Sequence, residues 1–255
     1  MPLTFLAEPI PPRGVATEVA DGVHRLVADN PGPMTYRGTN TYLVETRDGR
    51  VVIDPGPDDA AHVAAIIAHG PIARILLTHG HRDHIGALPA LQAATGARVG
   101  ALPDGFTAIP TPGHAADHVV FARADGVVFS GDHVMSWSTS VVSPPDGDMT
   151  DYFASLHRLL ARAADRLYLP GHGPPLHEPQ AFVRGLLEHR AARENAVLAA
   201  LGNGAATPAE LVPPVYGDIA APLRPMAERS LLAHLEKLVR ESRVRRDGER
   251  FSAVG

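Results

Sequence analysis

Three histidines and an aspartate lie within six residues of one another, directly after an apolar stretch of the chain. The stretch is Ile72 to Thr78, and the cluster reads His79-Gly80-His81-Arg82-Asp83-His84. A short apolar run bounded by turn residues is typical of a buried strand. Histidine is the commonest metal ligand, and a carboxylate suits a harder position. The pattern therefore predicts a turn that gathers metal ligands, with a merely His-rich polar turn as the alternative.

Four other segments carry polar residues of the same kind after strand-like runs. Asp54 follows Arg50 to Ile53, His114 follows Thr107 to Pro110, Asp132 follows Gly126 to Ser130, and His172 follows Arg166 to Leu169. In an open α/β sheet, sites collect outside the carboxyl ends of the strands. One rim would then bring together five imidazoles and two carboxylates, enough for two metal ions: His79, His81, Asp83, His84, His114, Asp132 and His172.

Helical stretches alternate with these runs, which predicts a layered α/β body. We expect helices over 58–69, 84–94 and 151–163, and a long one over 180–201. Further on, Thr207-Pro208 begins a helix, 223–241 repeats leucine at helical spacing, and an Asp-Gly pair at 247–248 indicates a hairpin. This order predicts a catalytic domain over 1–178, a connecting helix over 179–202 and a winged-helix-like domain over 203–255.

Composition removes several classes of function. The 255 residues include no cysteine, which excludes disulfides, cysteine-ligated zinc, iron–sulfur clusters and a thiol nucleophile. Lys237 is the only lysine, which disfavours Schiff-base chemistry. A formal charge of −5 excludes a globally basic nucleic-acid binder. Apolar runs are shorter than a membrane span, and prolines interrupt the first residues, so we expect a cytoplasmic protein without a membrane partner.

These motifs resemble those of the metallo-β-lactamase-fold hydrolases. The resemblance implies an αββα sandwich in which His79, His81 and His114 hold a first zinc ion. It implies that Asp83, His84 and His172 hold a second one, with Asp132 bridging the two, and that Asp54 orients a ligand histidine from behind. It also implies two divalent ions, with zinc expected and manganese or iron as alternatives.

A narrower resemblance, to the β-lactamase-like protein 2 subgroup, extends over nearly the whole chain. It rests on Arg37-Gly38-Thr39-Asn40-Thr41-Tyr42, Asp151-Tyr152, the segment 168–174 and the segment 189–194. The subgroup carries a C-terminal winged-helix-like domain, as the tail pattern predicts independently. The stretch between Val99 and Thr111 is short for the family, so one wall of the substrate groove is expected to be missing or replaced.

The predicted reaction is hydrolysis by a hydroxide that bridges two metal ions and attacks a carbonyl or phosphoryl centre. Asp83 and Asp132 are the predicted catalytic residues, because either carboxylate could orient this nucleophile. A small ester, thioester, lactone or lactam is the expected substrate, and single-stranded RNA cut by an endoribonuclease is the alternative. A nucleic-acid-binding regulator with a sensory metal site is disfavoured by the complete ligand set. Diiron redox chemistry is disfavoured by His81 at the third motif position.

Several other residues are open to two interpretations. His118 is expected to pack or hydrogen-bond behind the ligands. Asn40, Tyr42 and Ser140 lie in predicted loops near strand ends, as do 137–139, and such loops often contact substrate, although ordinary loop packing explains them equally. Eight basic and five acidic residues between Leu223 and Arg250 could contact phosphate or simply face solvent. A homodimer is one assembly that the sequence leaves open.

Overall fold

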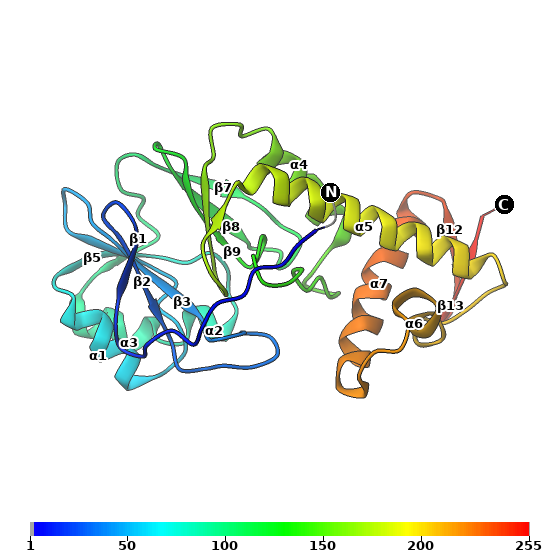
Figure 1. The fold of residues 1–255 in the computed structure, drawn as a ribbon, viewed down its shortest axis with the longest axis horizontal. Coiled ribbons are helices and arrows are strands. Elements are labelled where there is room, and N and C mark those ends of the chain that lie inside the picture. The colour runs from blue at the N-terminus through cyan, green and yellow to red at the C-terminus, as the bar shows by residue number, and fades with distance from the viewer. Residues whose placement is uncertain (1–2, 255) are drawn as a thin grey trace.

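The computed structural model describes residues 3–254 and has two β-sheets with helices on their outer faces (Figure 1). The first sheet has six strands in the order β1-β2-β3-β4-β5-β6. Its first four strands pair antiparallel, whereas β4, β5 and β6 run parallel. The strands are β1 (Thr17–Ala20), β2 (Val23–Val27), β3 (Asn40–Val44), β4 (Arg50–Ile53), β5 (Ile72–Leu76) and β6 (Arg98–Val99).

The second sheet has five strands in the order β11-β10-β9-β8-β7. Here β9 and β10 are parallel and the other neighbours antiparallel. The parallel pairs, β4–β5 in one sheet and β9–β10 in the other, each bring two carboxyl ends to one edge. The strands are β7 (Phe106–Pro110), β8 (Val119–Arg123), β9 (Val127–Gly131), β10 (Leu167–Pro170) and β11 (Leu176–His177).

Apolar side chains fill the space between the sheets, where Tyr42 and Ile53 of the first meet Phe129 and Leu169 of the second. On the outer face of the first sheet lie α1 (Ala60–Ala68), α2 (Arg82–Ile85) and α3 (Leu88–Thr95). On the outer face of the second lie α4 (Met149–Leu160) and the first half of α5 (Pro179–Leu201). The expected αββα sandwich is therefore confirmed.

The C-terminal part follows α5 and has its own apolar core, with Leu211, Leu231, Leu235 and Phe251 all buried. It comprises α6 (Pro208–Tyr216), the short η1 (Ala221–Leu223), α7 (Arg224–Arg240) and the hairpin of β12 (Val244–Asp247) and β13 (Arg250–Ala253). The Thr207 side chain accepts from the backbone nitrogen of Glu210 at the start of α6, as the sequence predicts for a capped helix. The winged-helix architecture expected from the tail is confirmed.

One expected helix, 84–94, is wrong: the structure divides it into α2 and α3. A continuous helix would place the ring of Pro89 against the carbonyl group of Ile85, one turn earlier. The break at Gly86 also lets the chain pass close to 57–58, since a Cβ atom at Gly86 would lie 2.6 Å from the nitrogen of Asp58. Among residues 3–254, no helix is long and apolar enough to cross a membrane.

Candidate metal centre

All seven predicted ligands gather at one edge of the sandwich, on loops that follow strand ends. His79 comes after β5, His114 after β7, Asp132 after β9 and His172 after β10. Because these strands end at the same edge, loops more than ninety residues apart in the chain meet there. The possible ligand atoms form three groups, and the atoms within each group lie within 4.8 Å of one another. The groups are His79–His81–His114, His79–His84–Asp132 and Asp83–His84–His172.

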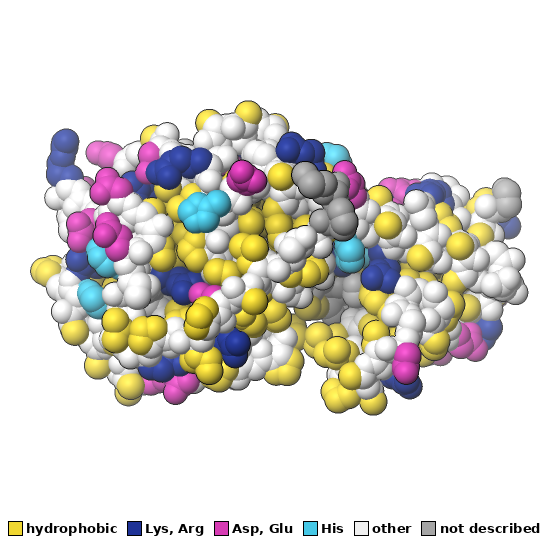
Figure 2. Space-filling model, in the orientation of Figure 1, with side chains coloured by type: hydrophobic (Ala, Val, Ile, Leu, Met, Phe, Trp, Pro, Cys, Tyr) yellow, Lys and Arg dark blue, Asp and Glu magenta, His cyan; other side chains and the backbone are white. Residues whose placement is uncertain are grey.

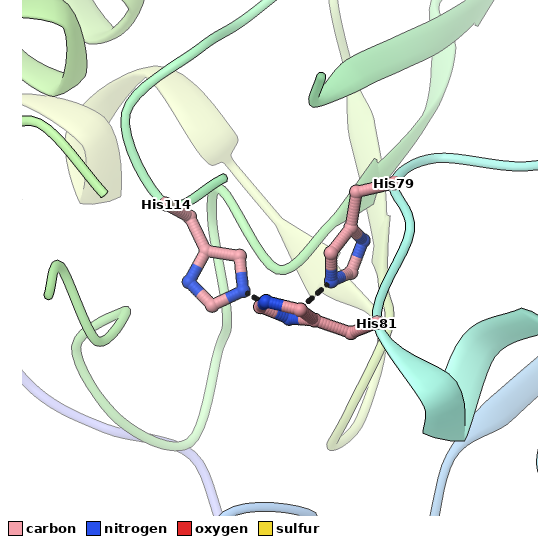
Figure 3. A group of neighbouring side chains, drawn as sticks. All are labelled: His79, His81 and His114. Atoms are coloured by element: carbon pink, nitrogen blue, oxygen red, sulfur yellow. Dashed lines mark hydrogen bonds between the residues drawn. The ribbon is translucent and has the colours of Figure 1, made fainter. Parts of the chain in front are cut away.

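The first group is formed by three imidazole rings that point toward one another (Figure 3). The Nδ1 atom of His81 lies 2.9 Å from Nε2 of His79 and 3.1 Å from Nε2 of His114. His81 Nδ1 carries at most one proton, so it can donate to only one of these two nitrogens at a time. The lone pair of the other Nε2 atom is then left without a donor, and a cation among the three nitrogens would satisfy it.

A second cluster of ligands is the group of Asp83, His84 and His172. Asp132 lies between this group and the first group, His79, His81 and His114. His172 Nε2 lies 3.2 Å from Asp83 Oδ2 and 3.4 Å from Asp132 Oδ2. Asp132 Oδ2 is also 3.7 Å from Nε2 of His114, in the first group. The Asp132 carboxylate thus contacts ligands of both groups, which is the position that a bridging ligand requires.

Hydrogen bonds on the far side of the rings determine which nitrogen faces the centre. His114 Nδ1 donates to the carbonyl oxygen of Val141 at 2.6 Å, and His172 Nδ1 donates to that of Gly38 at 3.3 Å. A carbonyl oxygen can only accept, so each Nδ1 carries a proton and Nε2 is the nitrogen that faces the centre. This is how proteins orient histidines that bind metals.

Asp54, which directly follows β4, orients two further histidines of the cluster. Its Oδ2 accepts from His84 Nδ1 at 2.8 Å and from the Thr78 hydroxyl at 2.7 Å, while Oδ1 accepts from the Thr78 nitrogen at 2.7 Å. The Thr78 hydroxyl lies 3.0 Å from Nδ1 of His79. One carboxylate therefore orients His84 directly and His79 through Thr78. The backbone of Asp54 has a φ of +53°, which aspartate and asparagine tolerate better than most residues.

Burial and neighbouring charges shift the pKa values of the cluster. Burial lowers the pKa of His79 far below its usual range and also lowers that of His114. Burial alone would raise the pKa of Asp132, but His172 and His84 hold it well below its usual value. Burial would also raise the pKa of Asp83, but the hydrogen bond with His172 lowers this pKa to about 2. Burial would lower the pKa of His84 and of His172, but the neighbouring carboxylates, Asp132 foremost, raise both, that of His172 to about 9. Neutral imidazoles and ionised carboxylates are the forms that bind metal ions, so binding at His84 and His172 would displace protons.

The residues present fit a pair of metal ions. The fully buried Nε2 of His84 and the buried Oδ1 of Asp132 lie 3.4 Å apart, and neither forms a hydrogen bond with the other or with any other described residue. Buried polar atoms are rarely left unpaired, so each needs a partner that the protein does not supply. A donor set of imidazole and carboxylate groups without thiolate is suited to zinc, manganese or iron.

His118 lies directly behind the cluster. Its Nε2 accepts from the backbone nitrogen of Asp132 at 3.2 Å, so its Nδ1 carries the proton and donates to the Thr111 hydroxyl at 2.9 Å. The side chain is 1% exposed and contributes no atom to the three groups of possible ligands. His118 thus supports the loop that carries Asp132.

Asn40, Tyr42 and Ser140, which were expected to contact substrate, are buried and hydrogen-bonded within the protein. All three side chains are at most 2% exposed and hydrogen-bond to backbone carbonyls. Asn40 donates to Pro170 and Gly173, and Tyr42 also donates to Pro170, so both hold the loop of His172. Ser140 donates to the carbonyl oxygens of Asp132 and His133. Asn40 and Tyr42 belong to strand β3 and not to the predicted loop, whereas Ser140 lies in a loop.

The sequence interpretation missed several groups that position the ligands. The carbonyl oxygens of Val141 and Gly38 carry no residue signal, because any amino acid supplies one. Thr78 was included only as the end of a strand. Asp146, whose Oδ2 lies 3.6 Å from His81 Nε2, is separated from the motif by more than sixty residues. A polar residue directly before the His-rich motif was the one available signal, and it pointed to Thr78.

Comparisons with known proteins agree with this architecture. The family model of the metallo-beta-lactamase superfamily matches residues 34–105 and 99–172, and that of the beta-lactamase associated winged helix domain matches 207–252. The superfamily match consists of two segments that meet near residue 99, where the chain is expected to be short. A crystal structure of a beta-lactamase domain protein from Burkholderia ambifaria has a TM-score of 0.81, with 23% identity, over 97% of this chain and 96% of its own.

Two curated relatives match over 90% of this chain at 30% identity. The beta-lactamase-like protein 2 homolog of Drosophila melanogaster is covered over 91% of its length, and an atrochrysone carboxyl ACP thioesterase of Aspergillus fumigatus over 84%. The superfamily match covers more than half of the chain. The chain therefore belongs to the metallo-beta-lactamase superfamily and is one of its hydrolases that carry a C-terminal winged helix domain.

Proposed function

We propose that this protein hydrolyses an acyl thioester with the help of two zinc ions. The observation that carries the proposal is the Asp132 carboxylate, which contacts ligands of both groups of the cluster. The similarity to a carrier-protein thioesterase over 90% of the chain supports the substrate class. Esters, lactones and lactams are related substrates that the same centre could attack.

The first ion would be held by His79, His81 and His114, and the second by Asp83, His84 and His172, with Asp132 shared. When bound, such a pair supplies an activated water and polarises a carbonyl group. The chain itself holds each donor atom in place through Asp54, Thr78, Val141 and Gly38. The low pKa values of Asp83 and Asp132 keep both carboxylates ionised, so each can accept a hydrogen bond from the attacking water.

A thioester is the substrate whose leaving group least needs a proton donor from these residues. Water adds its oxygen to the carbonyl carbon, the carbon–sulfur bond breaks, and the products are a carboxylic acid and a thiol. A thiol has a pKa of about 8.5, so the sulfur leaves as a thiolate and takes its proton from solvent. An amide or lactam nitrogen needs a proton donor as it leaves. We therefore place thioesters before lactams.

Single-stranded RNA is the alternative substrate, and the arginines of the C-terminal tail do not favour it. Arg240 is 2.5 Å from Asp148, and Arg250 is 3.2 Å from Glu210. Arg246 lies 3.9 Å from Glu236 and also over the ring of Phe251. A phosphate would have to compete with these carboxylates, which leaves a weak electrostatic footprint for a nucleic-acid strand.

The test is hydrolysis of 4-phenylbutyryl-N-acetylcysteamine by the zinc-loaded protein. Release of thiol can be followed with an aromatic disulfide reagent without background, because the chain has no cysteine. Asp132→Asn should abolish the reaction, while Asp125→Asn, which removes a carboxylate paired with Arg123, should retain it. The corresponding amide and an end-labelled single-stranded RNA complete the panel. Cleavage of the RNA without any release of thiol would overturn the proposal.

A further inference from the structure

A groove of about 420 Å³ separates the loop at 137–141 of the catalytic part from the helices of the C-terminal part. Trp137 and Val141 line one side, whereas Tyr216, Leu223 and Met226 line the other. The molecule is visibly hollowed between its two parts on the face drawn in Figure 2. The groove therefore exists only because the winged helix domain lies beside the catalytic domain.

The charges around this groove have one sign. Arg190 and Arg193 of α5 contribute to the lining, together with aromatic and aliphatic side chains, and the lining contains no aspartate or glutamate. Arg193 lies over the Tyr216 ring, 4.1 Å from its centroid, and donates to the Val215 carbonyl oxygen. A ligand with an apolar body and an anionic oxygen is complementary to such a surface.

Two nitrogen donors beside the groove have no partner among the described residues. They are Nε of Arg190 and Nε1 of Trp137, and the Nδ1 atom of His189 also has no partner. Arg190 is 3% exposed and is fixed by its contact with the Tyr152 ring and by donation to the Ser140 carbonyl oxygen. An unpaired buried donor destabilises the protein, and a ligand oxygen would supply the missing acceptor.

The groove adjoins the metal centre through two of its lining residues. Val141 accepts from Nδ1 of His114, and Ser140 donates to the carbonyl oxygen of Asp132. A molecule in the groove therefore lies against the loop that contacts both His114 and Asp132.

We infer that the groove binds the acyl group of the substrate, and that it selects acyl groups with an apolar body and an anionic oxygen. The inference rests on the proposed thioester hydrolysis for the identity of the substrate, but the binding can be measured without turnover. Arg190 and Arg193 supply the positive charge, Trp137 and Tyr216 supply aromatic surface, and the winged helix domain forms one wall of the acyl site. This assigns the domain a role in substrate selection.

The experiment uses the only tryptophan of the chain as the reporter, since Trp137 lines the groove and stacks on Tyr36. Zinc-loaded protein is titrated with 4-(4-carboxyphenyl)butanamide, whose anionic oxygen is on the body of the acyl group and not at its acyl carbonyl, and with the neutral 4-phenylbutanamide, and tryptophan emission is recorded. We expect a saturable change with both, and an affinity about tenfold higher for the anion, as one charge-assisted hydrogen bond supplies.

Met226→Glu and Met226→Gln form the decisive pair, because they differ by one negative charge on the groove wall, and Met226 belongs to none of the three groups of possible ligands. The glutamate variant should lose the preference for the anion, and the glutamine variant should keep it. The same emission change in both variants, with the anion bound equally well, would show that 4-(4-carboxyphenyl)butanamide binds elsewhere and would overturn the acyl site. A protein that binds the anion in the groove but releases no thiol would instead contradict the proposed reaction.

Discussion

The catalytic part and the C-terminal part are stabilised in different ways. In the C-terminal part and the end of α5, ten buried apolar residues form one cluster, among them Leu231 and Leu235. The edge of the catalytic part instead buries many imidazoles and carboxylates, and atoms of His84 and Asp132 there lack hydrogen-bond partners within the described residues. The C-terminal part buries fewer polar groups, such as His234 and Lys237 beside Glu194, and apolar burial, at about 25 cal/mol per Å², is its main source of stability. The edge of the catalytic part gains stability from whatever binds there.

The comparison indicates that burying the polar groups of the metal centre lowers the stability of the folded protein. Buried polar groups without partners oppose folding, and the apolar layers around them must offset that cost. Asp54, Thr78 and His118 connect the ligands to these layers by hydrogen bonds. Changes to the apolar cluster should therefore act on stability, and changes around the ligands should act on metal binding.

The largest effect is expected for Leu235→Ala in the C-terminal cluster. Leu235 is fully buried, and removal of such a side chain lowers the free energy of unfolding by about 2–5 kcal/mol. Urea unfolding measures this loss, and Leu232→Ala, the same change at a partly buried neighbour in α7, should cost less. Zinc content of the folded protein at 25 °C should be unchanged. Loss of zinc from the folded variant would mean that the two regions are coupled.

The second prediction tests the hydrogen bonds behind the metal ligands. Asp54→Asn preserves the shape of the side chain and tolerates the positive φ, but it removes the carboxylate that orients His84. Metal affinity or activity should fall about 10- to 100-fold. Competition with a chelator measures the affinity, and Asp58→Asn on the exposed surface nearby is the control. Unchanged affinity would contradict the role that we assign to Asp54.

The third prediction concerns acid sensitivity in the catalytic part. Burial lowers the pKa of His62 to about 4, and its Nε2 lies 2.8 Å from the Thr41 hydroxyl. The folded protein therefore favours neutral His62. Its contribution to stability is complete above the unfolded pKa of about 6.5 and is lost as the pH falls toward 4.

Between pH 7.5 and pH 5 this histidine should reduce the free energy of unfolding by about 2 kcal/mol. His62→Gln cannot titrate, so the loss for the wild type should exceed that for the variant by this amount. Urea unfolding at the two pH values measures the difference. Parallel losses in the two proteins would show that His62 titrates alike in the folded and unfolded states.

The smallest effect is expected where the two parts touch through exposed charges. Arg240 of α7 and Asp148, which caps α4, form an ion pair with side chains 50% and 28% exposed. Such pairs contribute about 0–1 kcal/mol. Arg240→Gln should lower the free energy of unfolding by no more than that, and 1 M salt should reduce the difference further. A loss comparable to that of Leu235→Ala would mean that the ion pair holds the two parts together.

Much of the metal centre could be predicted from the sequence, because its ligands occur in short motifs. The cluster at 79–84 and the single residues His114, Asp132 and His172 all follow strand ends, and the parallel pairing of strands brings those ends to one edge. The capped helix at Thr207 and the hairpin beyond residue 243 are also local patterns, and both are present. Strands β1, β2 and β3 carry weaker local signals and were not predicted as strands.

The remaining features depend on contacts between distant segments. Asn40 and Ser140 lie near strand ends, as a substrate contact would, but the fold buries them against the loops of His172 and Asp132. The carbonyl oxygens of Val141 and Gly38, which orient two ligands, are present at every residue and so leave no mark in the sequence. The groove beside Trp137 needs both parts of the molecule.

The sequence by itself determined the ligand types, the order of helices and strands, and the presence of a C-terminal helical part with a hairpin. These follow from local periodicity and from the chemistry of individual side chains. Tertiary structure decided which nitrogen of each histidine faces the centre, which polar side chains are buried, and where a groove opens. The physical reason is that hydrogen bonding and burial depend on atoms brought together by folding, and neighbouring residues in the chain do not specify them.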